Sequence, residues 1–343
     1  MNQIPFGLDI GATTIKAVWL SHEKDNYKLL AASLLPTPPR GLTSDAPLDL
    51  QEMAQAIRTI VSEAKITTKL LNVALPENQV YSRILDMPVL SDKELSSAIL
   101  YEAEQYIPVP LETMTLDWKV LRRPDAHEIN GKMQVLLVGA PTKLIQRYEK
   151  IMQMTGLTIN AIETEIISSV RVLVRDANFP NSVIINIGAV STSLGVVRNG
   201  IIVFTYTIPT GGVAINRAIA SDFGFSMAQA EEYKKTYGVV EKSFGGKIGK
   251  ATEPILSTIV NEVKKALTLY SEKYQDSPIA QVLLSGGSSK LPGLDLFFAK
   301  NCGIETVTAN PWKILGSQEV PKEILDNATG YTVAVGLAMR DDE

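Results

Sequence analysis

Two short stretches, half a chain apart, share one pattern that constrains the fold more than any other feature. They run from Leu8 to Thr14 and from Ile185 to Thr192. In each, an apolar strand contains Asp or Asn, a glycine and small or hydroxylated residues follow, and a second apolar strand begins. The pattern predicts two hairpins with tight turns, and its repetition indicates two related lobes.

Both turns are chemically suited to an anion. Glycine allows unusual backbone conformations and lets a ligand come close, and the exposed N–H groups and hydroxyls of such a turn suit phosphate. The pattern therefore predicts two lobes that face each other across a phosphate chain. The candidate phosphate-binding residues are Asp9, Gly11, Ala12, Thr13, Thr14 and Lys16 in the first turn and Asn186, Gly188, Ser191 and Thr192 in the second.

Asp9 is the candidate metal ligand. A carboxylate beside bound phosphates would hold Mg²⁺, usually through water, because Mg²⁺ keeps much of its hydration shell. Asp-x-Gly is also a common hairpin turn without any ligand. Both interpretations of Asp9 remain open at the level of sequence.

Composition excludes several classes of protein. The 343 residues are 45% hydrophobic, enough for two cores or one divided core, and the net charge of −4 gives no general argument for nucleic acid. No apolar run approaches the roughly 20 residues of a membrane span, and the start does not resemble a signal peptide. Cys302, His22 and His127 are too few for a disulfide framework or a Cys- or His-rich metal site. We therefore expect a cytoplasmic protein that neither binds nucleic acid nor inserts into a membrane.

The first half of the chain is expected to form a sheet, followed by a smaller unit with its own pattern of strands and helix. Asp49, with Glu52 three residues later, suggests the N-cap of a helix that extends to Ala64. Ser91 and Glu94 form a capping-box pattern that begins a helix extending to Tyr106. We expect strands over 4–10, 14–20, 27–34 and 71–75, and then a small inserted α/β subdomain over 77–141 with strands over 80–87, 116–121 and 133–139. Helices over 142–155 and 163–178 follow, separated by a strand over 159–162.

The second half repeats a meander and then becomes mainly helical. Asn199-Gly200 is a hairpin-turn sequence between two expected strands. We expect strands over 182–187, 193–198, 201–208 and 279–284, and helices over 213–222, 226–237, 252–275 and 328–340.

A second group of candidates suits a nucleoside rather than phosphate. After the strand over 279–284, a glycine-rich loop from Ser285 to Leu294 would let a base and a sugar lie against the backbone, although it also fits a strand–helix loop that needs a positive φ. Glu231 would bind ribose hydroxyls and the Lys234 stem would lie against the base, although such a charged run is usually a solvated helix face. The candidates in this group are Gly286, Gly287, Ser288, Lys290, Glu231 and Lys234, with Gly211 and Gly212 before the expected helix at 213.

The order of these motifs resembles that of the actin/Hsp70/sugar-kinase ATPase superfamily over nearly the whole chain. Residues 7–18 and 185–197 are similar to its two phosphate motifs, 285–294 to its adenosine motif, and 163–174 and 328–340 to its two connecting helices. The resemblance implies an actin-like (ribonuclease H-like) two-lobe α/β ATPase fold with an inserted small α/β subdomain. It divides the chain into a lobe I core (1–76, 142–178 and 328–343), the insertion (77–141), a lobe II core (179–212 and 279–327) and a helical subdomain (213–278).

Within the superfamily, the chain most resembles the PilM family of type IV pilus assembly. The stretch from Glu102 to Pro110, followed by Leu116 to Leu121, is similar to that family's inserted subdomain, which is placed as in the division protein FtsA. The resemblance implies ATP and Mg²⁺ between the lobes. It also implies that a groove beside the insertion holds the N-terminal cytoplasmic peptide of PilN, which pairs with PilO in the inner-membrane platform. The protein would then lie at the inner face of the cytoplasmic membrane through its partner.

Asn186 departs from the superfamily pattern, which usually has Asp there. An amide cannot supply the anionic oxygen that organises Mg²⁺ or water, and losing such help can cost orders of magnitude in rate. We therefore expect ATP binding with slow or absent hydrolysis, with Glu165 as the candidate catalytic residue and Glu163 as another group that could position water. Either glutamate could instead be a first-turn acid of a helix.

Other functions stay open at this stage. An active ATPase or a small-molecule kinase has the same fold, but no clear base for a kinase is found. An FtsA-like filament protein would need an amphipathic anchor, and the acidic end Asp341-Asp342-Glu343 does not supply one. Each of these functions is compatible with self-association.

Overall fold

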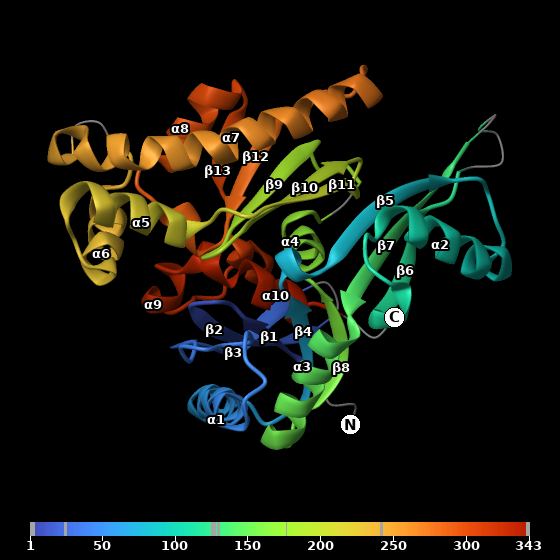
Figure 1. Ribbon diagram of the computed structural model, residues 1–343, viewed down its shortest axis with the longest axis horizontal. Helices are drawn as coiled ribbons and strands as arrows, with labels where there is room; N and C mark the ends of the chain where they lie inside the picture. Colours follow the sequence, from blue (N-terminus) through green and yellow to red (C-terminus); the bar gives the residue numbers. More distant parts are fainter. Residues whose placement is uncertain are drawn as a thin grey trace.

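The computed structural model is an α/β protein built on three sheets, with helices around and between them (Figure 1). It describes residues 4–23, 26–124, 128, 131–175, 177–240 and 243–340. His127 and the acidic end at 341–343 lie outside these residues.

The first sheet has the strand order β3-β2-β1-β4-β8. Its strands β1, β2 and β3 form an antiparallel meander, and β4 and β8 add to β1 in parallel. Helices α1 and α3 contribute to the buried core on one face, which includes Met53, Ile57 and Tyr148. We call this sheet with these helices lobe I. Its elements are β1 (Phe6–Ile10), β2 (Thr14–Glu23), β3 (Asn26–Pro36), α1 (Pro47–Glu63), β4 (Leu70–Leu75), α3 (Thr142–Thr155) and β8 (Thr158–Thr164).

The second sheet repeats the topology of the first, with the strand order β11-β10-β9-β12-β13. Strands β9, β10 and β11 form the antiparallel meander, and β12 and β13 add in parallel. The duplication inferred from two turns therefore extends to all five strands of each sheet. The strands are β9 (Ser182–Ile187), β10 (Thr192–Arg198), β11 (Ile201–Ile208), β12 (Gln281–Ser285) and β13 (Glu305–Thr308).

Helices of the second half share one core with the second sheet, and we call this assembly lobe II. Ile215, Leu256 and Phe298, from three different helices, belong to the same buried cluster as the strand residues Val183 and Ile185. The helices are α5 (Gly212–Phe223), α6 (Met227–Tyr237), α7 (Lys247–Lys273), α8 (Leu294–Cys302) and the short α9 (Lys322–Leu325).

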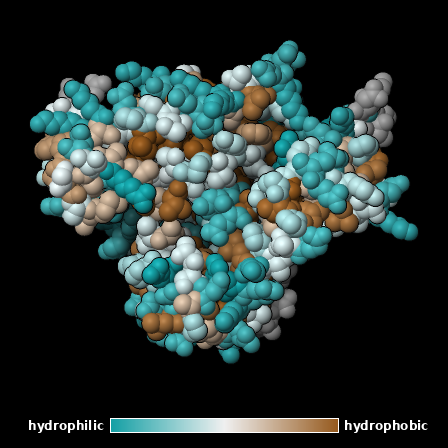
Figure 2. Space-filling model, viewed as in Figure 1, coloured by the Kyte–Doolittle hydropathy of each residue, from teal (hydrophilic) through white to brown (hydrophobic). Residues whose placement is uncertain are grey.

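The third sheet, of order β5-β7-β6, stands to the right in Figure 1 and has its own core around Leu95, Ile99 and Val135. In Figure 2, one of the apolar surface patches lies on this part of the molecule. The Ser91 capping box is confirmed, because both of its reciprocal hydrogen bonds are present. We call these elements the inserted unit: β5 (Tyr81–Met87), α2 (Asp92–Tyr106), β6 (Met114–Arg122) and β7 (Met133–Pro141).

Two short helices lie between the first and second sheets, α4 (Glu165–Leu173) and α10 (Thr332–Ala338). Ile166 of α4 packs with second-sheet residues, and Ala334 and Val335 of α10 pack with Val18 and Leu20 of the first sheet. The two helices meet where Gly336 approaches the backbone of Ser168. The layers therefore follow the order first sheet, α10, α4, second sheet, and the two helices connect the lobes.

Several helix boundaries differ from the sequence expectations. Asp49 is not an N-cap: α1 begins at Pro47, a residue favoured in the first turn, and Asp49 lies inside that turn. The expected helix over 163–178 begins only at Glu165 and ends at Leu173, because β8 continues to Thr164. Helix α7 begins five residues earlier than expected, at Lys247. The expected helix over 328–340 is a 3₁₀ turn followed by α10.

Candidate functional site

The two repeated turns have the same internal geometry. Asp9 pairs across its hairpin with Lys16, and Asn186 occupies the equivalent position opposite Ser193. Gly11 N–H donates to the Thr14 carbonyl at 3.0 Å, and Gly188 N–H donates to the Ser191 carbonyl at 2.9 Å. A methyl group at either glycine would lie 3.0 Å from that same carbonyl oxygen. The two stretches are therefore the same hairpin built twice.

The first turn carries a buried ion pair between Lys16 Nζ and Asp9 Oδ2, 2.9 Å apart. Both side chains are almost completely buried, whereas Ala12 and Thr13 at the tip of the turn are exposed. A buried pair of opposite charges is costly to separate, because the remaining charge loses its compensation. Lys16 therefore fixes one oxygen of Asp9.

Gly211 and Gly212 hold the second turn against the start of α5. Gly212 N–H donates to the Gly188 carbonyl at 2.9 Å, and Val213 N–H donates to the Ala189 carbonyl at 2.8 Å. A side chain at Gly211 would meet Gly188 O at 2.7 Å, and one at Gly212 would meet Ser288 Oγ at 2.2 Å. Close packing thus explains why glycine is found at both positions. The N–H groups of Gly212 and Val213 already donate to carbonyl groups of the second turn.

The loop after β12 lies directly on the second turn. Gly286 has a φ of 88°, which favours glycine, and a methyl group there would lie 2.5 Å from Asn186 Oδ1. Ser288 Oγ donates to the Gly188 carbonyl at 3.4 Å. No heavy atom that the structure describes lies within 4 Å of where a methyl group at Gly287 would be, apart from neighbours along the chain. The loop is therefore anchored at Gly286 and open at Gly287.

Gly330 brings the first turn and this loop together. A methyl group at Gly330 would lie 3.6 Å from Lys16 Cε and 3.9 Å from Gly287 Cα. Gly286 N–H donates to the carbonyl of the neighbouring Thr329 at 3.0 Å. The first turn, the second turn and the loop at 286–290 therefore converge, and we call this arrangement the two-turn site.

The predicted nucleoside residues on α6 form a compact ionic cluster. Glu231 accepts hydrogen bonds from Lys234 and from Asn216 Nδ2. Lys235 Nζ also lies 3.1 Å from Glu231 Oε1. Although partial burial disfavours the charge of Glu231, the hydrogen bonds from Lys234 and Asn216 lower its pKa to about 2. The buried Lys234 Nζ also reaches the Gly212 carbonyl at 3.5 Å. This cluster therefore adjoins the two-turn site at Gly212.

Three buried polar atoms around the two-turn site lack a partner among the described residues. They are Asn216 Oδ1, Ser285 Oγ and Thr329 Oγ1. Lys290, at the outer end of the loop, instead donates to Asn327 Oδ1 at 2.7 Å. Unpaired buried polar atoms are costly, and the described residues leave the hydroxyls of Ser285 and Thr329 on this side of the site without a partner.

Two glutamates near β8 have different roles. Glu163 lies on β8, not on a helix, and its carboxylate is paired with Arg171 and Arg340. Those pairs identify Glu163 as a structural anchor for the chain end near α10. Glu165 is the first residue of α4, and burial together with the charges of Asp9 and Glu77 raises its pKa to about 8.

Glu77 was not among the sequence candidates, yet it joins this group. It begins the 3₁₀ turn η1 (Glu77–Gln79) directly after β4 and is 3% exposed. Its carboxylate accepts from Ile166 N–H and from Ser82 Oγ, both at 3.3 Å. Burial raises the pKa of Glu77 to about 7. The sequence signal was only a charged residue placed directly after a buried strand.

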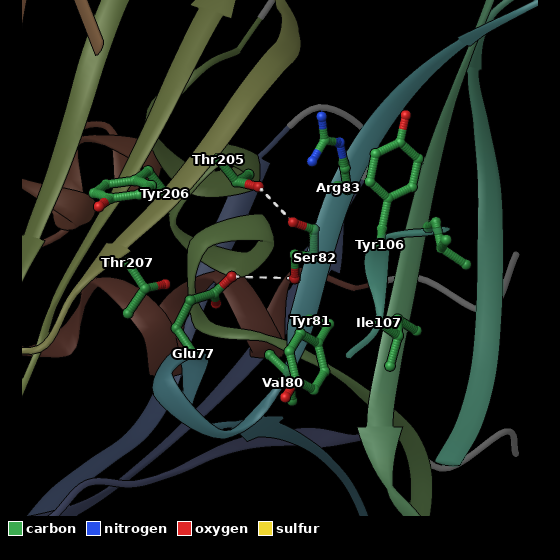
Figure 3. Close-up of a pocket in the computed structure, with 11 residues that line it drawn as sticks. Glu77, Val80, Tyr81, Ser82, Arg83, Tyr106, Ile107, Thr205, Tyr206 and Thr207 are labelled. Atoms are coloured by element: carbon green, nitrogen blue, oxygen red, sulfur yellow. Dashed lines mark hydrogen bonds between the residues drawn. The ribbon is translucent and has the colours of Figure 1, made fainter. Parts of the chain in front are cut away.

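Glu77 also lines a pocket of about 200 Å³ between the inserted unit and lobe II (Figure 3). One wall is formed by Val80 to Arg83 on and before β5, and the facing wall by Thr205 to Thr207 on β11. Both strands are sheet edges, since among the described strands β5 pairs only with β7 and β11 only with β10. Tyr106, Ile107 and Leu137 complete the lining.

The described part of the chain lacks a metal-binding cluster of side chains and a membrane-spanning helix. No three His, Cys, Asp or Glu side chains among these residues come together as a metal-binding group. Among the same residues, no helix combines the length and the apolar character that crossing a membrane requires.

Comparison with known proteins gives consistent matches. The family model described as type IV pilus assembly protein PilM matches residues 7–342. A solved PilM–PilN type IV pilus biogenesis complex is 27% identical, with a TM-score of 0.84 over 98% of each chain. Cell division protein FtsA of Streptococcus pneumoniae is 24% identical over 330 residues, which cover 84% of this chain and 71% of FtsA. MreB5 of Spiroplasma citri bound to AMPPNP is 14% identical, with a TM-score of 0.55 over 98% of this chain and 95% of MreB5. The predicted actin-like two-lobe fold is confirmed.

Proposed function

The chain belongs to the type IV pilus assembly protein PilM family, and we propose that it is an ATP-binding scaffold of the pilus assembly platform that binds the N-terminal cytoplasmic peptide of PilN. In this proposal, ATP connects the two lobes at the two-turn site, and the peptide occupies the pocket beside the inserted unit. The protein would then lie at the inner face of the cytoplasmic membrane through its partner.

The nucleotide part of the proposal rests on the meeting of the two turns and the loop at 286–290 near Gly330. This convergence brings a glycine turn from each lobe and an open glycine loop to one place, which is the arrangement that a triphosphate and a nucleoside require. Asp9 would hold Mg²⁺ through water, since Lys16 occupies only one of its oxygens. The likeness to MreB5, whose structure contains AMPPNP, agrees with this assignment.

The same residues argue for slow hydrolysis. Asn186 supplies an amide at the position where the first turn has Asp9. Burial and the charges of Asp9 and Glu77 raise the pKa of Glu165, the remaining candidate to activate water, to about 8, so most of it is protonated at neutral pH. We propose that ATP acts mainly as a ligand that favours one arrangement of the lobes. Phosphate release at ordinary enzyme rates, about 1–10³ s⁻¹, would instead support the alternative of an active ATPase or kinase.

The pocket supports the partner part of the proposal. Its two walls are unpaired strand edges, β5 and β11, and an extended peptide placed between such edges gains main-chain hydrogen bonds while pockets receive its side chains. The solved PilM–PilN complex, which aligns with 98% of this chain, agrees with a PilN peptide as the occupant. The FtsA-like alternative is not favoured, because FtsA matches at only 24% identity.

The division of the chain proposed from sequence has physical support at the inserted unit. The buried residues of that unit form a separate core, which includes Leu95 and Val135. The helices over 213–278 instead share a core with the second sheet. We therefore propose that the inserted unit moves relative to lobe I, whereas α5, α6 and α7 move together with the second sheet.

Asp9→Ala tests the nucleotide site. We expect the affinity for ATP with Mg²⁺, measured by calorimetric titration, to fall at least about tenfold, because the variant removes the metal-orienting carboxylate and leaves Lys16 buried without its partner. Glu112→Gln, an exposed carboxylate on the inserted unit, is the control and should bind like the wild type. Equal affinity in Asp9→Ala and the wild type would remove Asp9 from the site.

Thr207→Arg tests the pocket. The added side chain would extend into the space between β11 and β5, so a synthetic peptide with the sequence of the N-terminus of PilN from the same organism should bind at least about tenfold more weakly, a change of about 1.4 kcal/mol. Thr308→Arg, on the opposite edge strand β13, is the matched control. Unchanged peptide binding in Thr207→Arg, measured by fluorescence anisotropy, would place the peptide elsewhere.

A further inference from the structure

Glu77 contacts both the pocket and the start of α4. On one side it lines the pocket and accepts a hydrogen bond from Ser82 on β5 (Figure 3). On the other side its second carboxylate oxygen accepts from the backbone N–H of Ile166, in the first turn of α4. A change in the pocket that moves Glu77 must therefore also act on the start of α4.

The connection extends to the two-turn site. Ile166, whose N–H donates to Glu77, also packs with residues of the second sheet. Further along α4, the backbone of Ser168 is in close contact with Gly336 of α10, and the turn directly before α10 contains Gly330, the residue at which the two-turn site converges. Glu77, α4 and the segment from Gly330 through α10 thus form a continuous series of contacts from the pocket to the two-turn site.

The walls of the pocket come from two parts of the molecule with separate cores, the inserted unit and lobe II. Thr205 Oγ1 on β11 donates to the Ser82 carbonyl on β5 at 3.3 Å (Figure 3). Lys273 at the end of α7 forms an ion pair with Asp86, also on β5. The width of the pocket therefore depends on how lobe II is placed against the inserted unit, and a ligand that joins the two lobes fixes that placement.

We propose that Glu77 is a positioning residue that couples the pocket to the two-turn site, so that a peptide in the pocket and a nucleotide between the lobes change each other's affinity. This inference rests on the proposed function. The two states are a closed arrangement of the lobes and an open one, which hold β11 at different distances from β5. Coupling between binding sites is reciprocal, and factors of about 5–150 in affinity are typical.

Glu77→Gln tests the coupling while it keeps the size of the side chain. The affinity of the PilN peptide is measured without nucleotide and with saturating ATP and Mg²⁺, in the wild type, in Glu77→Gln and in the control Glu112→Gln. We expect the ratio of the two affinities to be at least fivefold in the wild type and in Glu112→Gln. At pH 8, where Glu77 is mainly ionised, we expect a ratio below twofold in Glu77→Gln, because the neutral amide weakens the hydrogen bond from Ile166.

Thr205→Val provides a second variant in case Glu77→Gln fails to fold. It removes the hydrogen bond from β11 to β5 without changing the size of the side chain, and it should likewise reduce the ratio. An undiminished ratio in either folded variant would overturn the inference, and so would a wild-type ratio near one. If ATP binds but the peptide does not bind at all, the proposed partner site is wrong. If both bind independently, only the coupling is wrong.

Discussion

Gly336→Ala should destabilise the protein by about 3 kcal/mol, the upper end of the usual range for overpacking. A methyl group at Gly336 would lie 1.9 Å from the carbonyl oxygen of Ser168 and 2.5 Å from its carbon. Both are backbone atoms of α4, so no rotation of a side chain can relieve the clash. The helices α10 and α4 would have to separate, and with them the two sheets on which they pack. The measurement is the urea midpoint of unfolding, followed by circular dichroism.

Gly249→Ala is the matched control for Gly336→Ala, because it makes the same substitution at another helical glycine. A methyl group at Gly249 in α7 would meet Val239 atoms at ordinary contact distances of 3.5–3.6 Å. Alanine favours a helix by about 1 kcal/mol over glycine, so this variant should be neutral or more stable. If both variants kept the wild-type midpoint, the close crossing of α10 and α4 would not limit stability.

Residues whose role depends on their neighbours in sequence were predicted well. The two turns were recognised because strand, glycine and hydroxylated residues follow one another, and the same N–H to carbonyl hydrogen bond closes each turn. The hairpin turn at Asn199-Gly200 was recognised for the same reason, and both residues have the expected positive φ. Local chemistry determines these features, so one stretch of sequence is sufficient to predict them.

Features that depend on contacts between distant segments were not predictable. Glu163 looked like a helix residue near the site, but Arg171 and Arg340 pair with it on β8, and Arg340 is 177 residues away. Gly212 was a candidate for the nucleotide site, but its close contacts with Ser288 and Lys234 could not be predicted from its sequence neighbours. Glu77 escaped notice because its partners lie on β5 and α4.

The stability of the protein without nucleotide should fall as the pH rises from 5.5 to 8.5. Glu77 and Glu165 have pKa values of about 7 and about 8 in the folded protein because burial disfavours their charged forms. In the unfolded chain both groups ionise near pH 4.5. The folded state therefore binds more protons between these limits, and its advantage is fully present below about pH 4.5 and is lost as the pH rises through 7 and 8.

Glu77→Gln should flatten this dependence by about 2 kcal/mol, since only the part of the Glu77 shift between pH 5.5 and its pKa of about 7 falls within the measured range, and one pKa unit corresponds to about 1.36 kcal/mol. The amide does not titrate, so the variant should lose stability between pH 5.5 and pH 8.5 only through the remaining groups, Glu165 foremost. The measurement compares urea midpoints at the two pH values for the wild type, Glu77→Gln and the exposed control Glu112→Gln. Above pH 5 the pairing of Glu231, whose pKa is about 2, does not contribute, because Glu231 is ionised in both states. The same slope in Glu77→Gln and the wild type would mean that the Glu77 carboxyl is charged in the folded protein throughout this range.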